Sequence, residues 1–153
     1  MTHLKEGDNA PAFSVKNEKG EEVKLSDFSG KKLVLYFYPK DMTPGCTTQA
    51  CNLRDHYSTL TKKGIAVLGI SADDEARHEK FIGKHDLPFS LLADTNLEMI
   101  KAYGIWGEKK FMGKVYDDIH RTTFLINEEG IIHAIIKKPK TKAHAEEILA
   151  LFD

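Results

Sequence analysis

Two long apolar runs on either side of an amphipathic segment constrain the fold of this chain more than any other feature. Residues 33–38 and 65–71 read LVLYFY and IAVLGIS, without the polar alternation of a half-exposed strand. Such runs are typical of strands buried on both faces of a sheet. Residues 46–62, between them, carry apolar side chains at alternating three- and four-residue steps, which predicts a helix. The three segments together predict two buried parallel strands joined by a helix.

Shorter elements flank this unit, and glycine-rich turns separate them. We expect an N-terminal hairpin over residues 12–16 and 22–25, a helix over 74–85 capped by Ser71 or Asp73, a strand over 87–94, a helix over 96–103, strands over 121–126 and 131–136, and a final helix over 143–152. Residues 106–114 mix aromatics with glycines and predict an irregular loop. Trp106 and Phe111 either line a substrate entrance or anchor this loop to the body, and aromatic residues in such loops favour the anchoring role.

The order of these elements predicts an α/β fold class. Strands alternate with helices before a terminal hairpin and helix, which favours a central mixed β-sheet flanked by helices on both faces. This arrangement resembles the thioredoxin-like fold, with an added N-terminal β-hairpin. The length of 153 residues is typical of one domain, so we expect a single thioredoxin-like domain over residues 1–153.

Composition excludes several classes of partner. The formal net charge is −1, and 29% of residues are charged, which offers no field that would gather nucleic acid or a membrane surface. The first residues have no apolar signal-peptide core, and no segment approaches the roughly 18 apolar residues of a membrane span. We therefore expect a cytoplasmic protein whose thiols are kept reduced.

The only two cysteines of the chain, Cys46 and Cys51, indicate redox chemistry. Cys46 falls in the first turn of the predicted helix, where unpaired backbone N–H groups and the positive end of the helix dipole favour a thiolate. Thr43, three residues earlier, can offer its hydroxyl to the sulfur or to a bound oxygen, and Gly45 lets the backbone approach closely. The alternative is that the cysteines are small buried hydrophobic residues, and this alternative weighs more for Cys51 than for Cys46.

The spacing of the two cysteines implies a conformational change if they ever bond to each other. Five residues along an intact helix place the Cα atoms roughly 8 to 9 Å apart. A disulfide needs a separation of about 4.4 to 6.8 Å. A bond between Cys46 and Cys51 within one chain therefore requires the first turns of the helix to unwind, which helix ends permit more readily than core strands.

The segment that ends at Cys46 resembles a known family. Residues 39–46, PKDMTPGC, are similar to the P-x-x-x-T/S-x-x-C signature of the peroxiredoxins. A second cysteine five positions later resembles their bacterioferritin comigratory protein branch, also called peroxiredoxin Q. Residues 8–13, 34–39, 103–109 and 119–126 resemble further blocks of that branch, so the similarity covers nearly the whole chain.

The resemblance implies a role for each matching residue. Cys46 would be the peroxidatic nucleophile and Cys51 the resolving cysteine. Thr43 and Arg121 would be polar partners of the reacting sulfur, and Pro39 would shield the pocket. One departure is Asp118, where many members of the family carry glycine.

The resemblance also implies an activity, that of a thiol-dependent peroxidase. It would reduce hydrogen peroxide and small organic hydroperoxides without a cofactor, and thioredoxin or a similar dithiol donor would recycle it. We expect a monomer or weak homodimer. A redox sensor or holdase chaperone that uses the same cysteines without significant peroxidase turnover remains the alternative.

The seven histidines give no sign of a metal site. No pair has the spacing of metal ligands with a supporting carboxylate or cysteine. His78 and His85 lie seven residues apart on one predicted helix, and we expect both at the solvated surface. His120 precedes Arg121, where it either touches the rim of the pocket or has a structural role, and we leave it outside the site.

Overall fold

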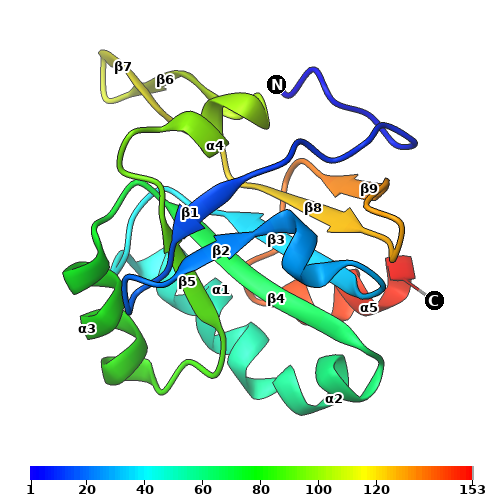
Figure 1. Cartoon of the computed structure of the whole chain (residues 1–153). Coiled ribbons are helices and arrows are strands. Elements are labelled where there is room, and N and C mark those ends of the chain that lie inside the picture. The colour runs from blue at the N-terminus through cyan, green and yellow to red at the C-terminus, as the bar shows by residue number, and fades with distance from the viewer. Residues whose placement is uncertain (153) are drawn as a thin grey trace.

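The computed structural model describes residues 1–152 and has at its centre a five-stranded mixed sheet (Figure 1). In the order in which they pair, its strands are β5 (Ser90–Ala93), β4 (Ile65–Ser71), β3 (Lys32–Phe37), β8 (Thr122–Ile126) and β9 (Ile132–Ile136). β3, β4 and β5 are parallel, whereas β8 and β9 are antiparallel to their neighbours. The α/β class, the mixed sheet and the two buried parallel strands are confirmed.

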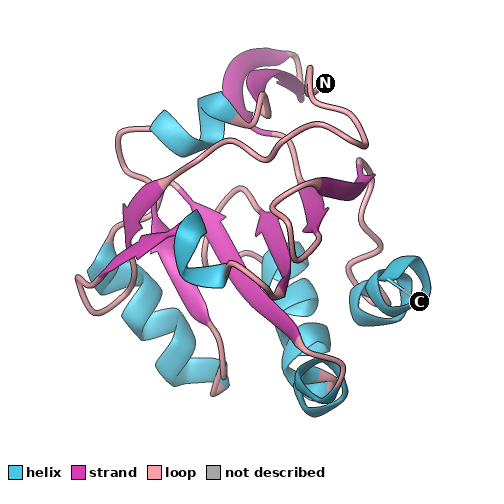
Figure 2. Ribbon diagram, turned by 45° about the vertical axis from the view of Figure 1, so that its right-hand side comes forward, coloured by secondary structure: helices cyan, strands magenta, loops and turns pink. Residues whose placement is uncertain are grey.

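Helices cover both faces of this sheet (Figure 2). One face carries α1 (Pro44–Asp55), α2 (Tyr57–Lys62), α3 (Glu75–His85) and α5 (His144–Phe152). Their apolar side chains pack in one core cluster with Val34 and Tyr36 of β3. Within residues 1–152, no helix combines the length with the apolar character that crossing a bilayer requires.

The opposite face of the sheet is covered by the N-terminal part of the chain and one short helix. These elements are β1 (Ser14–Lys16), β2 (Glu22–Lys24), the 3-10 helix η1 (Leu25–Phe28) and α4 (Glu98–Ala102). They pack against Leu33, Leu35 and Phe37, the β3 residues that alternate with Val34 and Tyr36. The predicted hairpin is confirmed as the antiparallel pair β1–β2.

The helix predicted over residues 46–62 differs from the structure in two ways. It begins at Pro44, so Cys46 is its third residue, and it is interrupted at His56. There the imidazole Nδ1 lies 2.9 Å from the carbonyl oxygen of Asn52, while the backbone bond to the same oxygen is longer, at 3.3 Å. This side-chain competition for a helical carbonyl accompanies the break. In α3 the cap also differs from the prediction, because Asp74 accepts from the Arg77 N–H.

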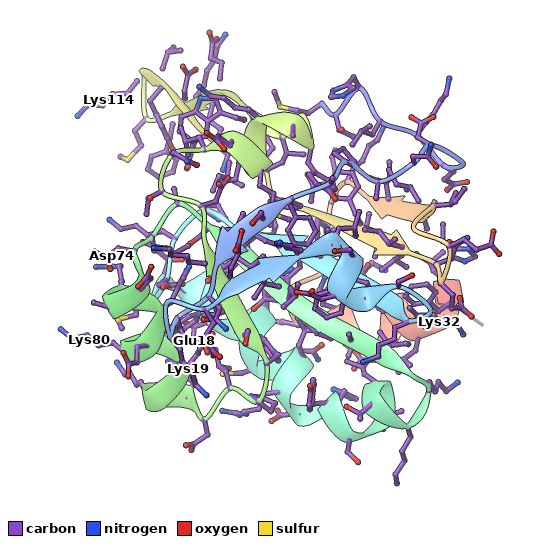
Figure 3. All side chains as sticks on the ribbon, viewed as in Figure 1. Glu18, Lys19, Lys32, Asp74, Lys80 and Lys114 are labelled. Carbon is purple, nitrogen blue, oxygen red and sulfur yellow. The ribbon has the colours of Figure 1, made fainter. Side chains whose placement is uncertain are left out.

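Residues 106–119 form a second hairpin rather than the predicted irregular loop. Its strands are β6 (Trp106–Phe111) and β7 (Lys114–Ile119), which pair with each other as a separate two-stranded sheet. Met112 and Gly113 both have positive φ, 50° and 79°, as a two-residue hairpin turn requires. Trp106 packs on the core as expected, but Phe111 is 65% exposed, so its predicted anchoring role is wrong. Lys114 marks the outer end of this hairpin (Figure 3).

Asn52 joins α1 to the C-terminal helix. Its Oδ1 accepts from the backbone N–H of Ala145, in the first turn of α5, at 2.7 Å. Its Nδ2 donates to the carbonyl oxygen of Lys142 at 3.0 Å. One turn later, Nε2 of His56 lies 2.9 Å from a carboxylate oxygen of Glu146. An α1 side chain therefore satisfies an N–H group that α5 leaves without an intrahelical acceptor.

Candidate active site

A buried carboxylate fixes the loop between β3 and α1. The two oxygens of Asp41 accept from the Tyr38 hydroxyl at 2.5 Å and from Nδ1 of His78 at 2.6 Å, while its N–H donates to Asp73 at 2.8 Å. Burial raises the pKa of Tyr38 well above its ordinary value, so the hydroxyl keeps its proton. The next residue, Met42, has a φ of 66°, which costs a non-glycine residue about 1 kcal/mol. The anchored Asp41 offsets this strain.

His78 is fully buried, so the expectation that it lies at the solvated surface is wrong. Its Nδ1 faces the carboxylate of Asp41 and its Nε2 lies 2.9 Å from the carbonyl oxygen of Leu92. Both partners are acceptors, so both ring nitrogens donate and the ring is an imidazolium. Burial by itself lowers the pKa of His78, but the hydrogen bond and charge of Asp41 outweigh it, and the pKa is raised.

Asp41, Asp73 and His78 have the atom types and proximity of metal ligands. Their ligand atoms lie within 4.8 Å of one another. Each is already engaged, however, because Asp73 accepts from the Ser71 hydroxyl at 2.7 Å and pairs with Arg77 at 3.2 Å. The cluster is therefore a closed hydrogen-bond network that ties the loop to β4 and α3.

Cys46 lies at the N-terminal end of α1, with a side chain that is 1% exposed and packed in the core cluster. The first backbone bond of the helix runs from Thr47 N–H to the carbonyl oxygen of Thr43. The N–H groups of Gly45 and Cys46 therefore precede the ladder of α1. The positive end of the helix is next to the sulfur, as the sequence predicted.

Arg121 reaches the sulfur from the segment between β7 and β8. Its Nη2 lies 3.3 Å from Sγ of Cys46, and its Nη1 donates to Oε1 of Gln49 at 2.5 Å. Arg121 thus brings a permanent positive charge to the thiol. The sequence interpretation missed Gln49, which the structure buries completely; the signal for it in the sequence is its position one helical turn after Cys46, on the same face of the helix.

Gly45 makes room for this guanidinium. A Cβ atom at position 45 would stand 3.3 Å from Nη2 of Arg121, the same nitrogen that contacts Cys46. That separation is closer than ordinary van der Waals contact between such atoms. The glycine therefore allows the close approach that the sequence analysis expected.

Thr43 and Pro39 lie in the loop that leads to Cys46. The hydroxyl of Thr43 does not donate to the sulfur. Oγ1 of Thr43 donates to the carbonyl oxygen of Lys40 at 2.9 Å rather than to the sulfur. Its lone pairs remain able to accept a hydrogen bond. Pro39 is half-buried and lies two residues after the end of β3, next to Tyr38.

Two buried rings lie behind the site. Burial raises the pKa of Tyr36 well above its ordinary value, and the charges of Asp41 and Cys46 act in the same direction. His144 packs edge-on against Tyr36, with 6.4 Å between ring centroids. Burial lowers the pKa of His144, against the opposing hydrogen bond of Glu147, so this imidazole is neutral.

Cys51 is half-buried on α1, and both cysteines are free thiols. It lies beside the end of α3, where Nδ1 of His85 is 3.9 Å from its Sγ. The structure has α1 as a regular helix between the two cysteines, the arrangement from which a disulfide would require unwinding.

Asp118 and His120 have structural contacts in the second hairpin. The carboxylate of Asp118 accepts from the Ile119 N–H at 2.8 Å and lies 3.6 Å from Nζ of Lys109 on the paired strand. Nε2 of His120 lies 3.1 Å from the carbonyl oxygen of Glu108. Aspartate is thus accommodated within a regular strand.

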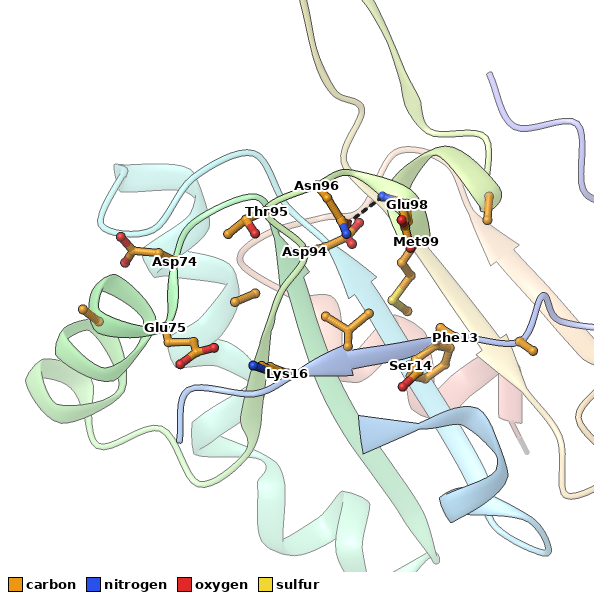
Figure 4. A pocket seen from close by; sticks show the side chains of 15 residues that line it. Phe13, Ser14, Lys16, Asp74, Glu75, Asp94, Thr95, Asn96, Glu98 and Met99 are labelled. Carbon is orange, nitrogen blue, oxygen red and sulfur yellow. Dashed lines mark hydrogen bonds between the residues drawn. The ribbon is translucent and has the colours of Figure 1, made fainter. Parts of the chain in front are cut away.

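A cavity of about 820 Å³ lies beside β1, with Phe13, Asp94 and Met99 among the residues that line it (Figure 4). Its lining comes from β1, the start of α3 and the segment from β5 to α4. Burial raises the pKa of Asp94 although the Ile100 N–H donates to its carboxylate. Cys46, Thr43 and Arg121 are not among the described residues that line this cavity.

Comparison with known protein families gives one match over most of the chain. The sequence model of the AhpC/TSA family matches residues 6–135. Peroxiredoxin Bcp of Escherichia coli is 48% identical over 149 residues, which cover 97% of this chain and 96% of that protein. Peroxiredoxin Bcp of Bacillus subtilis is 47% identical over 143 residues, which cover 94% and 91% of the two chains.

Solved structures agree with the sequence matches. A cysteine-to-serine mutant of PrxQ from Xylella fastidiosa superposes with a TM-score of 0.92 and 30% identity, over 99% of this chain and 97% of that one. The bacterioferritin comigratory protein of Xanthomonas campestris, studied for its alkyl peroxide reduction activity, gives a TM-score of 0.87 and 31% identity over 98% and 96% of the chains.

Proposed function

The chain belongs to the AhpC/TSA family and is a peroxiredoxin, a thiol-dependent peroxidase, and from this premise we propose that Cys46 is the sulfur that attacks the hydroperoxide. The observation that carries the assignment is the 3.3 Å contact between Nη2 of Arg121 and Sγ of Cys46. Together with the free N–H groups at the start of α1, this charge stabilises the thiolate, which is the reactive form of cysteine.

In the first step the thiolate of Cys46 attacks one oxygen of the hydroperoxide. An S–O bond forms, the O–O bond breaks, and the second oxygen leaves with the electron pair of that bond and takes up a proton. The sulfur is oxidised to a sulfenic acid, and the peroxide is reduced to water or an alcohol. Negative charge grows on the leaving oxygen, so a fixed cation beside the reacting atoms lowers the barrier.

Three residues have proposed roles around this reaction. Arg121 holds the peroxide with its forked donors, a geometry that lysine cannot copy. Thr43 accepts a hydrogen bond from the hydroperoxide, because its own proton is engaged by the Lys40 carbonyl oxygen. Pro39 limits access of water to the pocket. Hydrogen peroxide and small organic hydroperoxides are the proposed substrates, in keeping with the alkyl peroxide activity of the Xanthomonas relative.

Cys51 is the proposed resolving cysteine. Its thiol would condense with the Cys46 sulfenic acid, release water and form an intramolecular disulfide after α1 unwinds locally. Thioredoxin or a similar dithiol would then reduce the disulfide. This cycle needs a reducing compartment, for which we propose the cytoplasm. It needs no residue from a second subunit, so a monomer or weak homodimer suffices.

Matched serine substitutions five residues apart test the assignment. Cys46→Ser abolishes peroxide reduction, whereas Cys51→Ser consumes one equivalent of peroxide and then stops in a thioredoxin-coupled assay. Intact mass after one equivalent of peroxide shows the loss of two hydrogen atoms in the wild type and the gain of one oxygen atom in Cys51→Ser. Sustained coupled turnover by Cys51→Ser would remove Cys51 from the resolving role.

A further inference from the structure

His85 lies beside the cysteine that is not in contact with Arg121. Its Nδ1 is 3.9 Å from Sγ of Cys51, although 34 residues separate the two in sequence. His85 is the last residue of α3, and Cys51 is in the second half of α1. Both side chains are half-buried, so the contact has access to water. The expectation that His85 is simply a solvated surface residue leaves this thiol contact unexplained.

The surroundings of His85 hold its ring in place. Nη1 of Arg54, one helical turn after Cys51, donates to the carbonyl oxygen of His85 at 2.8 Å. The imidazole stands edge-on to the fully buried ring of Phe81, with 5.4 Å between centroids and 81° between planes. Asp86, with a φ of 52°, ends the helix directly after it. Backbone and ring are both fixed, so the approach to the sulfur is a built contact.

We propose that His85 is the general base that removes the proton of Cys51 for the resolving step. This inference rests on the proposed function, because it requires Cys51 to attack the oxidised Cys46. A thiolate, and not a thiol, is the attacking species in disulfide formation. Histidine is the side chain that exchanges protons near neutral pH, and it acts as a base when it lies within reach of the proton.

The proposed step balances as follows. His85 takes the proton from Sγ of Cys51, and the resulting thiolate attacks the sulfur of the Cys46 sulfenic acid. An S–S bond forms, the S–O bond breaks, and the hydroxide leaves as water after accepting a proton, which the imidazolium or solvent returns. The sulfur of Cys51 is oxidised by one unit and that of Cys46 is reduced by one.

The geometry also orders the events. The contact between His85 and Cys51 exists while α1 is intact, so the proton is removed before the helix unwinds. Arg54, whose Nη1 donates to the carbonyl oxygen of His85, adds a positive charge next to this contact. Unwinding then delivers a thiolate to Cys46 rather than a thiol that still has to be deprotonated inside the pocket.

Rapid-quench mass spectrometry separates the two chemical steps. After mixing with hydrogen peroxide, the gain of one oxygen atom reports the sulfenic acid and the subsequent loss of water reports the disulfide. In His85→Gln we expect oxidation of Cys46 at the wild-type rate and disulfide formation slower by at least about 10-fold. His133→Gln, at the opposite edge of the sheet, is the matched control and resolves at the wild-type rate.

Two further measurements distinguish a base from a structural contact. In His85→Gly, added imidazole restores the rate of disulfide formation without changing the rate of sulfenic acid formation. In a Cys46→Ser background, His85→Gln slows alkylation of Cys51 by iodoacetamide at neutral pH. Alkylation of Cys51 requires no unwinding of α1. It therefore tests the role of His85 even if unwinding limits the rate of disulfide formation.

The possible outcomes separate the two proposals. If wild type forms a disulfide and His85→Gln forms it as fast or faster, with unchanged alkylation of Cys51, the role of His85 is overturned while the proposed function stands. If wild type only gains oxygen and never loses water, Cys51 does not resolve, so the roles of His85 and Cys51 both fail while the attack by Cys46 stands.

Discussion

Nη1 of Arg121 donates to Oε1 of Gln49 at 2.5 Å, and this bond aims the other arm of the guanidinium at Cys46. A free arginine side chain has many rotamers, and fixing one of them in advance lowers the cost of binding the peroxide. Gln49 is a positioning residue in this arrangement, since it touches the arginine and not the sulfur.

The first prediction follows from this relationship. Gln49→Met keeps the length of the side chain but removes the acceptor, so we expect oxidation of Cys46 by hydrogen peroxide to slow roughly 10-fold, or about 1.4 kcal/mol. Stopped-flow competition for peroxide measures the rate. Gln49→Glu retains an acceptor for Arg121 and is the control that should keep the guanidinium in place. A wild-type rate in Gln49→Met would refute the positioning role.

Gly45→Ala should lower the rate of Cys46 oxidation without lowering the free energy of unfolding. The new Cβ would stand 3.3 Å from Nη2 of Arg121 and push that nitrogen, which contacts Cys46, aside by a few tenths of an ångström. Alanine is also a better helix former than glycine by about 1 kcal/mol. We therefore expect an oxidation rate lower by about 10-fold and a free energy of unfolding that is unchanged or higher, measured by urea denaturation. A variant that is less stable yet equally fast would contradict this reasoning.

His78 should make stability fall as the pH rises above neutrality. Its pKa is raised in the folded state by Asp41 against the effect of burial, so its contribution is complete below the unfolded value of about 6.5. It is lost as the pH rises through the folded value, with a slope of up to about 1.4 kcal/mol per pH unit. Urea denaturation of wild type and His78→Gln across this range measures the slope, which His78→Gln should lack.

His144 should show the opposite dependence. Burial lowers its pKa in the folded state, so below about pH 6.5 the unfolded chain binds a proton that the folded chain does not. The free energy of unfolding therefore falls as the pH drops from about 6.5 toward the lowered folded value. His144→Gln should remove this acid-side slope and leave the alkaline slope of His78 intact. Equal slopes in wild type and variant on the acid side would argue against a neutral His144.

The turn of the second hairpin offers a stabilising substitution. Met112 is 87% exposed and has a φ of 50°, a conformation that asparagine tolerates better than methionine. Met112→Asn should raise the stability of the hairpin by up to about 1 kcal/mol. Hydrogen exchange of the β6–β7 amides measures the local effect. Met112→Val, with a β-branched side chain, should accelerate the same exchange, and the reverse order would show that the turn is not under strain.

The sequence predicted the sheet well because burial on both faces leaves a direct mark in composition. The strand predicted over residues 65–71 coincides with β4, and the apolar run over 33–38 lies within one residue of β3 at each end. The sequence analysis predicted that Arg121 lies close to Cys46 only through the family resemblance, since no local pattern links positions 75 residues apart.

Two features could not be predicted from the local sequence, the β6–β7 hairpin and the burial of His78. The β6–β7 hairpin is mostly exposed on both faces, so backbone pairing stabilises it without an apolar alternation to detect. His78 is buried because Asp41, 37 residues away, supplies the counter-charge. Backbone pairing determines the hairpin, and a residue distant in sequence determines the burial of His78, so neither leaves a local pattern.

The link between Asn52 and α5 has a consequence for the oxidised protein. Asn52 follows Cys51 directly, so a segment that uncoils to bring the sulfurs together also withdraws the acceptor from Ala145. The C-terminal helix would lose its cap at the moment the disulfide closes. The oxidation state of the two cysteines would then change the stability of α5. A protease or an antibody that recognises α5 would distinguish the disulfide form of the enzyme from the reduced form.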